Sequence, residues 1–335
     1  MPVAVELFDD LDAVAADAAG ALDRAAQPSL FDRLDWFRLT AAHCPPRGKL
    51  LVARGREGER SCWLFLAIEN KSAQVLGSWY SLRAGPVDYP PQPSIDLLTA
   101  ICAALRRARP RISSITVGPV GDPAPLLAGL RGGGWWASAT PMTVNWQVET
   151  EGLDWAVFWA ARPSTLRNTW RRKAKAAGLA ITIHRAFDPE AWAEYEAIYR
   201  ESWKPAEGSP GFLRALAEQE GAAGALRLGI ARQDGRAIAA QFWLVENGIA
   251  TIHKLAHVEG SRALSPGTIL SEAMFRHVIE QDRPRLIDFG TGDEPYKADW
   301  MDRRATLWRV DAHDPARPIG LVRGVRMLVR DRARR

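Results

Sequence analysis

The sequence predicts a mixed α/β protein of α+β-like type, built from two tandem domains in which helices flank a mixed sheet. The chain has 335 residues, which exceeds the size that one hydrophobic core usually serves. One succession of patterns, in the order helix, hairpin, strand, helix and strand, occurs twice along the chain. Each hairpin turns at a segment that contains glycine, residues 55–60 in the first half and 233–236 in the second. We infer that the two domains arose by duplication.

The elements of the first half follow from apolar spacing. Residues 31–42 and 95–107 carry apolar side chains at helical intervals, which predicts two helices. Short apolar runs predict the strands in residues 50–54, 62–69, 75–83 and 112–117.

The second half repeats this order. Helical spacing predicts helices in residues 192–203 and 268–280. Apolar runs predict strands in residues 226–231, 237–246, 249–256 and 285–289. Because the order of helices and strands is the same in both halves, we predict two domains with the same fold.

We place the first domain in residues 1–150 and the second in residues 151–316, followed by a basic tail in residues 317–335. The joining segment, residues 149–161, carries two tryptophans and a phenylalanine and is expected to pack between the halves. Ionisable residues gather at the predicted strand ends of the second half far more than of the first. The second domain is therefore expected to be the active one.

Composition excludes several classes of protein. The three cysteines, Cys44, Cys62 and Cys102, have no Cys-x-x-Cys spacing, which indicates neither a disulfide framework nor a zinc site. We therefore predict no metal. The first ten residues lack the features of a signal peptide, and no apolar run approaches the ~18 residues that span a bilayer. We expect a cytoplasmic protein.

The segment Ser265-Pro-Gly-Thr268 opens the second predicted helix of the second half. The first N–H groups of a helix have no intrahelical partner and bind phosphate well. With Arg262 just before the turn, Ser265, Gly267 and Thr268 are the candidate phosphate-binding residues. The alternative is an ordinary helix start, because Ser and Thr cap helices and Pro suits the first turn.

Ionisable side chains crowd into ten positions at the end of the last predicted strand, at Asp288, Asp293, Glu294, Tyr296 and Lys297. A phosphate seat beside proton donors and acceptors indicates transfer chemistry on a phosphate-bearing donor. The alternative is a structural pair of acid and lysine that closes a loop. Both interpretations stay open at this point.

These blocks resemble the FemAB-like and CelD-like branch of the GNAT acyltransferase superfamily, whose members carry two fused GNAT-fold domains. The resemblance covers about residues 163–308. It rests on these blocks: Ser164-Thr-Leu-Arg-Asn-Thr-Trp-Arg-Arg-Lys173, Asp234-Gly-Arg-Ala-Ile-Ala-Ala-Gln241, Ser265-Pro-Gly267, and Asp288-Phe-Gly-Thr-Gly-Asp-Glu-Pro-Tyr-Lys297 with Trp300.

The resemblance implies a donor and an acceptor. The donor is acyl-CoA, used as a co-substrate with no tightly bound cofactor, or aminoacyl-tRNA in the FemAB relatives; the acceptor is an amine. Residues 262–268 take the place of the loop that binds the pyrophosphate of the donor. The second domain becomes the catalytic GNAT domain and the first a degenerate copy.

Acyl transfer to an amine needs a base for the amine proton and an acid for the leaving thiolate. Asp293 or Glu294 could supply the base and Tyr296 the acid, while Asp288 orients a neighbour and Lys297 neutralises an anion. His253 lies on the strand that lines the thioester in GNAT domains, and its near-neutral pKa also suits a base. A core histidine is the alternative reading of that residue.

Strand alternation places Lys254 on the face opposite His253. Which of His253, Asp293 and Glu294 is the base is left open.

Two basic segments suggest partners. Residues 162–175 could bind CoA phosphates, nucleic acid or acidic lipid, or form a solvated helix face; we expect no nucleic-acid partner. The tail, residues 317–335, mixes seven arginines and one aspartate with apolar residues. It predicts either peripheral binding to an anionic membrane surface, at the inner face of the inner membrane, or a frayed basic terminus. Glycines at 320 and 324 weaken it as a helix.

The predicted function is an acyl-CoA-dependent N-acyltransferase that acts by direct attack, because the cysteines lie outside the proposed site. A hydrophobic amino alcohol, as used by the ceramide synthase type of bacterial N-acyltransferase, suits the fourteen tryptophans and the basic tail. The alternatives are acetyl transfer to a sugar or exopolysaccharide, FemAB-like transfer from aminoacyl-tRNA to a peptidoglycan precursor, and a non-enzymatic membrane-attached scaffold.

Overall fold

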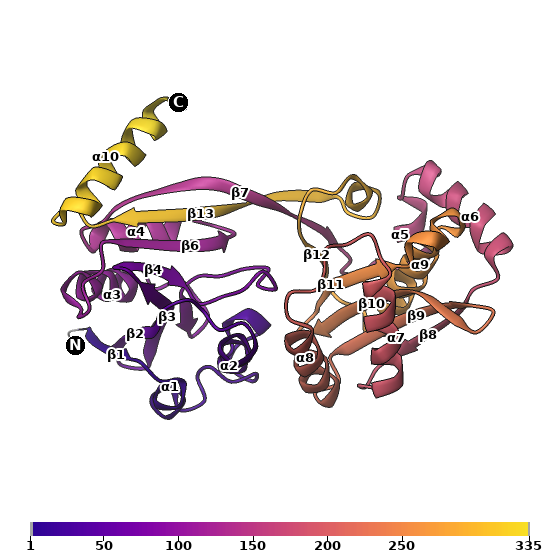
Figure 1. The fold of residues 1–335 in the computed structure, drawn as a ribbon, viewed down its shortest axis with the longest axis horizontal. Coiled ribbons are helices and arrows are strands. Elements are labelled where there is room, and N and C mark those ends of the chain that lie inside the picture. Colours follow the sequence, from indigo (N-terminus) through magenta and orange to yellow (C-terminus); the bar gives the residue numbers. More distant parts are fainter. Residues whose placement is uncertain (1–2, 334–335) are drawn as a thin grey trace. The chain divides into compact units, whose positions relative to one another are not determined.

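The computed structural model describes residues 3–333, and the chain divides into two compact units (Figure 1). Unit 1 comprises Met1–Thr143 together with Thr306–Arg335, and unit 2 comprises Val144–Ala305. The sequence predicts one domain in residues 151–316 and a separate tail. In the structure the chain instead returns to unit 1 at Thr306, and residues 334–335 of the tail lie outside the described range.

Pairing of one late strand explains this return. Strand β13 (Arg303–His313) runs antiparallel to β6 (Ser114–Val120), from the pair Trp308 and Val120 to the pair His313 and Ser114. A C-terminal strand thereby completes the sheet of an N-terminal unit. Apolar periodicity within one segment carries no information on such distant pairing.

The strands of unit 1 follow the order β1-β2-β3-β4-β6-β13. The others are β1 (Ala4–Phe8), β2 (Lys49–Glu57), β3 (Arg60–Glu69), β4 (Ser72–Val75) and β5 (Val87–Tyr89), which pairs with β3. β7 (Trp136–Glu149) begins in unit 1 and ends in unit 2.

The helices of unit 1 are α1 (Leu11–Ala18), η1 (Leu30–Asp32), α2 (Leu34–His43), α3 (Ile95–Arg107), α4 (Ala124–Gly132) and α10 (Pro318–Ala333). Helix α3 buries Leu97, Leu98, Ile101 and Leu105 in the core of this unit, together with apolar side chains of β2, β3 and β6. The spacing of three and four residues is the one that predicts the helix.

The strands of unit 2 follow the order β7-β12-β11-β10-β9-β8. They are β8 (Ala180–His184), β9 (Leu226–Gln233), β10 (Arg236–Glu246), β11 (Ile249–His257) and β12 (Leu286–Thr291), with the end of β7.

The helices of unit 2 are α5 (Trp155–Ala160), α6 (Ser164–Ala177), α7 (Pro189–Arg200), α8 (Pro210–Ala222), η2 (Glu259–Leu264), α9 (Pro266–His277), the π-helix η3 (Val278–Asp282) and η4 (Pro295–Asp299). The aromatic joining segment packs into unit 2, where the Phe158 ring stacks on Phe275 of α9 with 5.5 Å between centroids.

The repeated plan predicted from the sequence is confirmed. In each unit an antiparallel hairpin, β2–β3 or β9–β10, precedes a strand that pairs in parallel with a strand reached through a helix. The parallel pairs are β4 with β6 through α3, and β11 with β12 through α9. The tandem mixed α/β architecture follows directly.

Candidate functional site

Strands β11 and β12 pair over only three residues, from Ile249 with Leu286 to Thr251 with Asp288. Beyond this point β12 continues along β7, and β11 continues along β10 to His257. Within the described residues, the edge of β11 that faces β12 therefore has no paired strand after Thr251. Backbone N–H groups on such an edge can donate to a bound ligand.

A β-bulge in β11 lies just past this separation. Trp243 of β10 pairs with Ile252 and Phe242 pairs with Lys254, so His253 is the extra residue of the bulge. The His253 ring lies 5.4 Å from the Phe242 ring, and Lys254 lies over Tyr199 of α7. Phe242 in turn contacts Trp192 of α7.

The prediction that His253 and Lys254 occupy opposite faces is therefore wrong. Strand alternation assumes one residue per pleat, and a bulge inserts one residue without reversing the face. Both side chains consequently lie toward α7. Burial, with the adjacent Lys254 charge, lowers the pKa of His253 to about 3. A ring of such low basicity is a weak proton acceptor at neutral pH.

The loop after β12 holds the other predicted side chains. Asp288 accepts hydrogen bonds from Asn145 (2.9 Å), Gln147 (2.8 Å) and the backbone N–H of Gly290 (2.7 Å). These bonds tie the end of β12 to β7. Asp288 thus occupies a structural position.

Asp293 and Lys297 are likewise engaged within the protein. Asp293 is exposed and binds Arg304 through both carboxylate oxygens; the hydrogen bond from Arg304 lowers the pKa of Asp293. The buried ammonium of Lys297 donates to the carbonyl of Thr291 (2.6 Å) and pairs with Glu294 at 3.0 Å. Lys297 therefore stabilises the loop after β12 through bonds to two of its residues.

Glu294 and Tyr296 are exposed as well, at 53% and 38% accessible. Burial raises the pKa of Glu294, but hydrogen bonds from its own N–H and from Lys297 lower it on balance. Burial, with the negative charge of Glu294, raises the pKa of Tyr296 well above its usual value. Lys204 also lowers the pKa of Glu294, which places these two charges near one another.

The predicted phosphate seat is formed by the turn between η2 and α9. Ser265 adopts a left-handed backbone with φ of 54°, which ends η2 and starts α9 at Pro266. The Ser265 side chain makes no capping bond, so the alternative of a serine-capped helix start is not what the structure has. Arg262 is exposed on η2.

Two neighbours frame this turn. Lys173 of α6 donates to the carbonyl of Ala263 at 2.6 Å, which brings the basic helix against η2. On the other side, a Cβ on Gly267 would lie 3.4 Å from the His257 ring, and this ring lies tilted against Trp203 with 4.3 Å between centroids. The positive end of the α9 dipole and a nearby lysine favour an anion here.

The basic segment before and within α6 divides by role. Arg162 is buried and bonds Asp302 and the carbonyl of Trp300, so it holds the unit together. Arg167 donates to the carbonyl of Arg162. Arg171 and Arg172 are exposed on α6.

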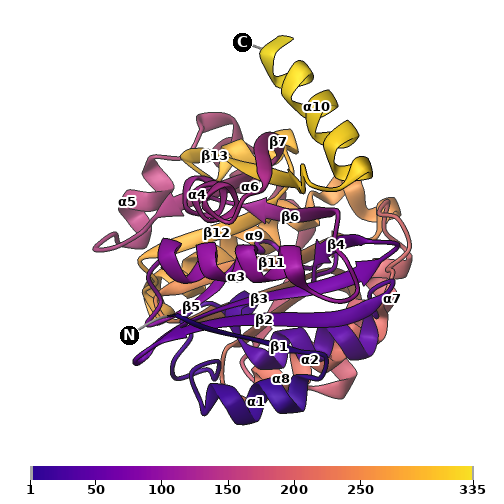
Figure 2. The same ribbon diagram turned by 90° about the vertical axis from the view of Figure 1, so that its left-hand side faces the viewer.

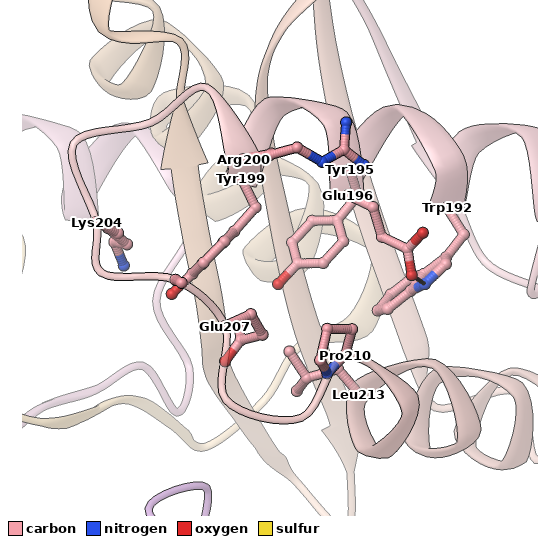
Figure 3. Close-up of a pocket in the computed structure, with 10 residues that line it drawn as sticks. Trp192, Tyr195, Glu196, Tyr199, Arg200, Lys204, Glu207, Pro210 and Leu213 are labelled. Atoms are coloured by element: carbon pink, nitrogen blue, oxygen red, sulfur yellow. Dashed lines mark hydrogen bonds between the residues drawn. The ribbon is translucent and has the colours of Figure 1, made fainter.

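A cavity of about 330 Å³ lies between α7, α8 and the loop that joins them (Figure 3). Its lining combines aromatic and apolar side chains with charged ones: Trp192, Tyr195, Glu196, Tyr199, Arg200, Lys204, Ala206, Glu207, Pro210 and Leu213. A largely apolar cavity with a few polar groups is the usual form of a small-molecule site.

The charged groups of the cavity connect it to β11. Glu207 accepts a hydrogen bond from Lys254, with 3.2 Å between Oε1 and Nζ. Burial, followed by the charge of Glu207, raises the pKa of Tyr199 to about 12. Burial, followed by the charge of Lys254, lowers the pKa of Lys204 to about 8.

Tyr199, Lys204 and Glu207 are not among the residues predicted from the sequence. They belong to no motif: Tyr199 lies in the predicted helix of residues 192–203, and Lys204 and Glu207 follow it in a segment with no predicted element. The sole signal was the presence of ionisable residues between two capped helices. Asp188 caps α7 and Ser209 caps α8, each followed by proline.

Neither a metal centre nor a membrane span is found in the part of the chain that the structure describes. Within residues 3–333, no group of three or more His, Cys, Asp or Glu side chains could hold a metal ion. In the same range, no helix combines the length and apolar character needed to cross a bilayer.

Similarity to known proteins agrees with this arrangement. Residues 160–298 match the family described as acetyltransferase (GNAT) domain. No curated protein matches the chain.

Several solved structures share the fold. FemX has a TM-score of 0.60 at 10% identity, covering 91% of this chain and 96% of that one. A tandem GNAT protein from the clavulanic acid biosynthesis pathway has a TM-score of 0.53 at 15% identity, covering 92% and 98%. L-PGS from Bacillus licheniformis has a TM-score of 0.50 at 11% identity, covering 82% and 86%. At these identities the likeness concerns the fold.

Proposed function

Because this chain belongs to the GNAT acyltransferase superfamily, with its GNAT domain in residues 160–298, we propose that it is an N-acyltransferase that uses acyl-CoA and takes its amine acceptor into the cavity between α7 and α8. One observation carries this proposal. Glu207, which lines the cavity, bonds Lys254 of β11 just where β11 separates from β12. An acceptor in the cavity would therefore lie beside the free edge of β11.

The donor is proposed to lie along this edge with its pyrophosphate at the start of α9. Backbone N–H groups of Gly267 and Thr268 are in the first turn, where no intrahelical acceptor exists. Arg262 and Lys173 add positive charge around the turn. Donor N–H groups on β11 beyond Thr251 would polarise the thioester carbonyl as charge develops on its oxygen.

Glu207 is the proposed base. It lines the cavity proposed for the acceptor, where it is paired with Lys254, and Asp293 and Glu294 do not line this cavity. The ring of His253 is barely basic. The carboxylate would bind the acceptor ammonium and take its proton, and the free amine would attack the thioester carbon. The C–N bond forms as the C–S bond breaks, and the protonated amide nitrogen then gives its extra proton to water.

Lys204 is the proposed acid for the departing thiolate. Lys204 lines the cavity, and its pKa of about 8 suits proton transfer at physiological pH. Direct attack is favoured over an acyl-cysteine. Burial raises the pKa of Cys62 well above its usual value and that of Cys102 to about 12, so neither thiol is activated.

The acceptor is proposed to be a hydrophobic amino alcohol of the sphingoid-base kind. Trp192, Tyr195 and Leu213 offer apolar walls, while Glu207 and Lys204 offer polar groups at one side of the same cavity (Figure 3). An amphipathic amine matches both, because its chain is apolar and its amino and hydroxyl groups are polar. We also propose that the tail, residues 317–335, lies on an anionic membrane surface, which would bring a lipid acceptor to the enzyme.

A FemAB-like transfer from aminoacyl-tRNA is the second candidate. The similarity of fold to FemX and the exposed Arg171 and Arg172 of α6 favour it. RNA binding of this kind would weaken steeply with salt.

The two candidates are separated by one set of assays with the purified protein. Calorimetry with coenzyme A is followed by turnover of C2 to C18 acyl-CoAs with a sphingoid base, glucosamine and a peptidoglycan precursor. We expect heat from coenzyme A and the highest kcat/KM with the sphingoid base. Activity that requires charged tRNA and ignores acyl-CoA would replace the lead candidate by the second.

A further inference from the structure

A second cavity, of about 460 Å³, lies in unit 1 between α10 and the strands β4, β6 and β13. Four arginines line it: Arg309, Arg323, Arg326 and Arg330. Hydroxyl and amide side chains line it as well: Ser72, Ser114, Thr116 and Gln74. The concentration of cationic and hydrogen-bonding groups in one cavity indicates an anionic ligand.

The positive charge of this cavity is largely uncompensated. Asp311 is the acid among the lining residues, and it is engaged by Arg309 at 2.9 Å and by the hydroxyl of Thr116 at 2.7 Å. Among the side chains that the structure describes, Arg323, Arg326 and Arg330 form no ion pair. Within the described side chains, these three guanidinium groups therefore have no carboxylate partner.

Hydroxyl groups converge on the same place. Ser72 of β4 and Ser114 of β6 are register partners in the parallel pair, and their Oγ atoms lie 3.0 Å apart. Arg323 of α10 reaches both, with its Nη1 at 3.4 Å from each Oγ. A guanidinium flanked by two serine hydroxyls is a suitable set of donors for phosphate oxygens.

Two glycines allow α10 to pack closely against the rest of unit 1. A Cβ on Gly320 would lie 2.2 Å from the carbonyl oxygen of Asp314, and one on Gly324 would lie 2.7 Å from the Trp136 ring. With Met327, these glycines form the buried side of the helix. They were expected to weaken the helix; instead they permit its close packing.

The opposite side of α10 is apolar and open to solvent. Its exposed residues follow helical spacing, with 42% to 64% of each accessible: Leu321, Val322, Val325, Leu328 and Val329. The arginines at 323, 326 and 330 recur at intervals of three and four on a separate side. α10 starts beside unit 1 and its C-terminal end projects away from the strands (Figure 2). An apolar side next to a cationic one is the pattern of a helix at an anionic bilayer surface.

We propose that the cavity under α10 binds the phosphate of an anionic phospholipid headgroup while the Leu and Val side of α10 enters the bilayer. This assigns a specific site to the membrane association proposed above and rests on that association, but not on the transfer reaction. Charge complementarity and the adjoining apolar helix side together favour a lipid over a soluble phosphate ester.

Vesicle co-sedimentation tests the proposal with the full chain. The vesicles are pure phosphatidylcholine, or phosphatidylcholine with phosphatidylglycerol. We expect binding to the anionic vesicles alone. Arg323→Gln with Arg326→Gln should weaken that binding at least about 10-fold, since each basic residue near an anionic surface contributes several-fold. Ser72→Ala with Ser114→Ala, which keeps every charge, should weaken it as well.

The charge-matched control is Arg47→Gln with Arg111→Gln, two exposed arginines of unit 1 outside the cavity. It should keep most of the binding. An equal loss in this control would mean attraction by net charge and would overturn the headgroup site. Unchanged binding in both cavity variants would overturn it while leaving membrane association intact, and absence of vesicle binding would overturn both.

A second arm distinguishes the lipid from a soluble ligand. Calorimetry with sn-glycerol 3-phosphate measures the cavity without acyl chains, and Val325→Glu with Leu328→Glu removes the apolar side of α10. We expect this double variant to lose the vesicles. If it instead retains them, insertion of the apolar side of α10 is overturned. If sn-glycerol 3-phosphate binds tightly while vesicles do not, the occupant is a soluble phosphate compound. Binding of tRNA in place of vesicles would likewise overturn the proposal.

Discussion

Glu207 of the α7–α8 loop accepts a hydrogen bond from Lys254 of β11, with 3.2 Å between Oε1 and Nζ. Both side chains are largely buried, at 11% and 18% accessible. This hydrogen bond joins the α7–α8 loop, which contains no recognisable motif, to strand β11. The unpaired edge of β11 is where we propose that the acyl-CoA donor binds. This bond relates the acceptor cavity to the proposed point of transfer.

The first prediction concerns the base. Glu207→Gln keeps the shape of the side chain but removes its charge and proton affinity, so kcat/KM for the amine should fall about 100-fold or more. The measurement is steady-state acylation with the best acceptor of the screen, with Tm as a check on folding.

Glu196→Gln is the matched control, because Glu196 lines the same cavity but bonds the Trp192 indole at 2.9 Å. It should keep activity within a few-fold of the parent. If Glu207→Gln is as active as this control, Glu207 is not the base.

The second prediction concerns pH. Lys204 acts as an acid only while protonated, and burial beside Lys254 lowers the pKa of Lys204 to about 8. kcat should therefore fall as pH rises through about 8. Lys204→Arg should move this limb to higher pH, because guanidinium keeps its proton.

Lys204→Met should lower the plateau of kcat and remove the limb from the profile. The profile is recorded with saturating acyl-CoA. An alkaline limb that persists unchanged in Lys204→Met belongs to another group and refutes this role.

The third prediction concerns the loop after β12. Lys297→Met removes the bond to Thr291 and the pair with Glu294 from a buried position. A loss of about 1–3 kcal/mol is expected, which lowers Tm by about 2–10 °C in a chain of this size. Scanning calorimetry measures it.

Lys175→Met, an exposed lysine of α6, serves as the control and should leave Tm within about 1 °C. An unchanged Tm in Lys297→Met would show that the loop does not depend on this ammonium.

The fourth prediction concerns the packing of α10. Gly324→Ala places a Cβ 2.7 Å from the Trp136 ring, so the helix must shift from unit 1. Limited proteolysis should cut the C-terminal segment several-fold faster than in the parent.

The control is Gly121→Ala, since a Cβ there meets no atom within 4 Å. It should be cut at the parental rate. Equal protection of Gly324→Ala would mean that α10 does not depend on this close approach.

Much of the fold could be predicted because it depends on local patterns. The hairpins β2–β3 and β9–β10, the helix α3 and the strand β11 follow from apolar spacing and glycine turns. The site was predicted in part. The turn at Ser265 and the loop after Asp288 are distinctive in sequence, whereas the cavity loop with Glu207 is not.

Other features depended on contacts between distant residues. Asp293 reads as a free acid in the sequence, but Arg304 binds it in the structure. His253 reads as a near-neutral base, but burial makes its ring a weak one. A pKa depends on the surroundings of a group, which residue order alone does not specify.

The sequence by itself determined the tandem α/β fold, the turn before α9 that we propose to bind phosphate, and the basic character of the tail. Each of these depends on residues that are close together in the chain. Only the tertiary structure decided that β13 returns to unit 1, that the bulge turns His253 and Lys254 to one face, and that α10 closes a cationic cavity. These features arise from strand register and from close backbone contacts between segments far apart in the chain. In such contacts the free energy of packing outweighs the conformational preference of each segment by itself.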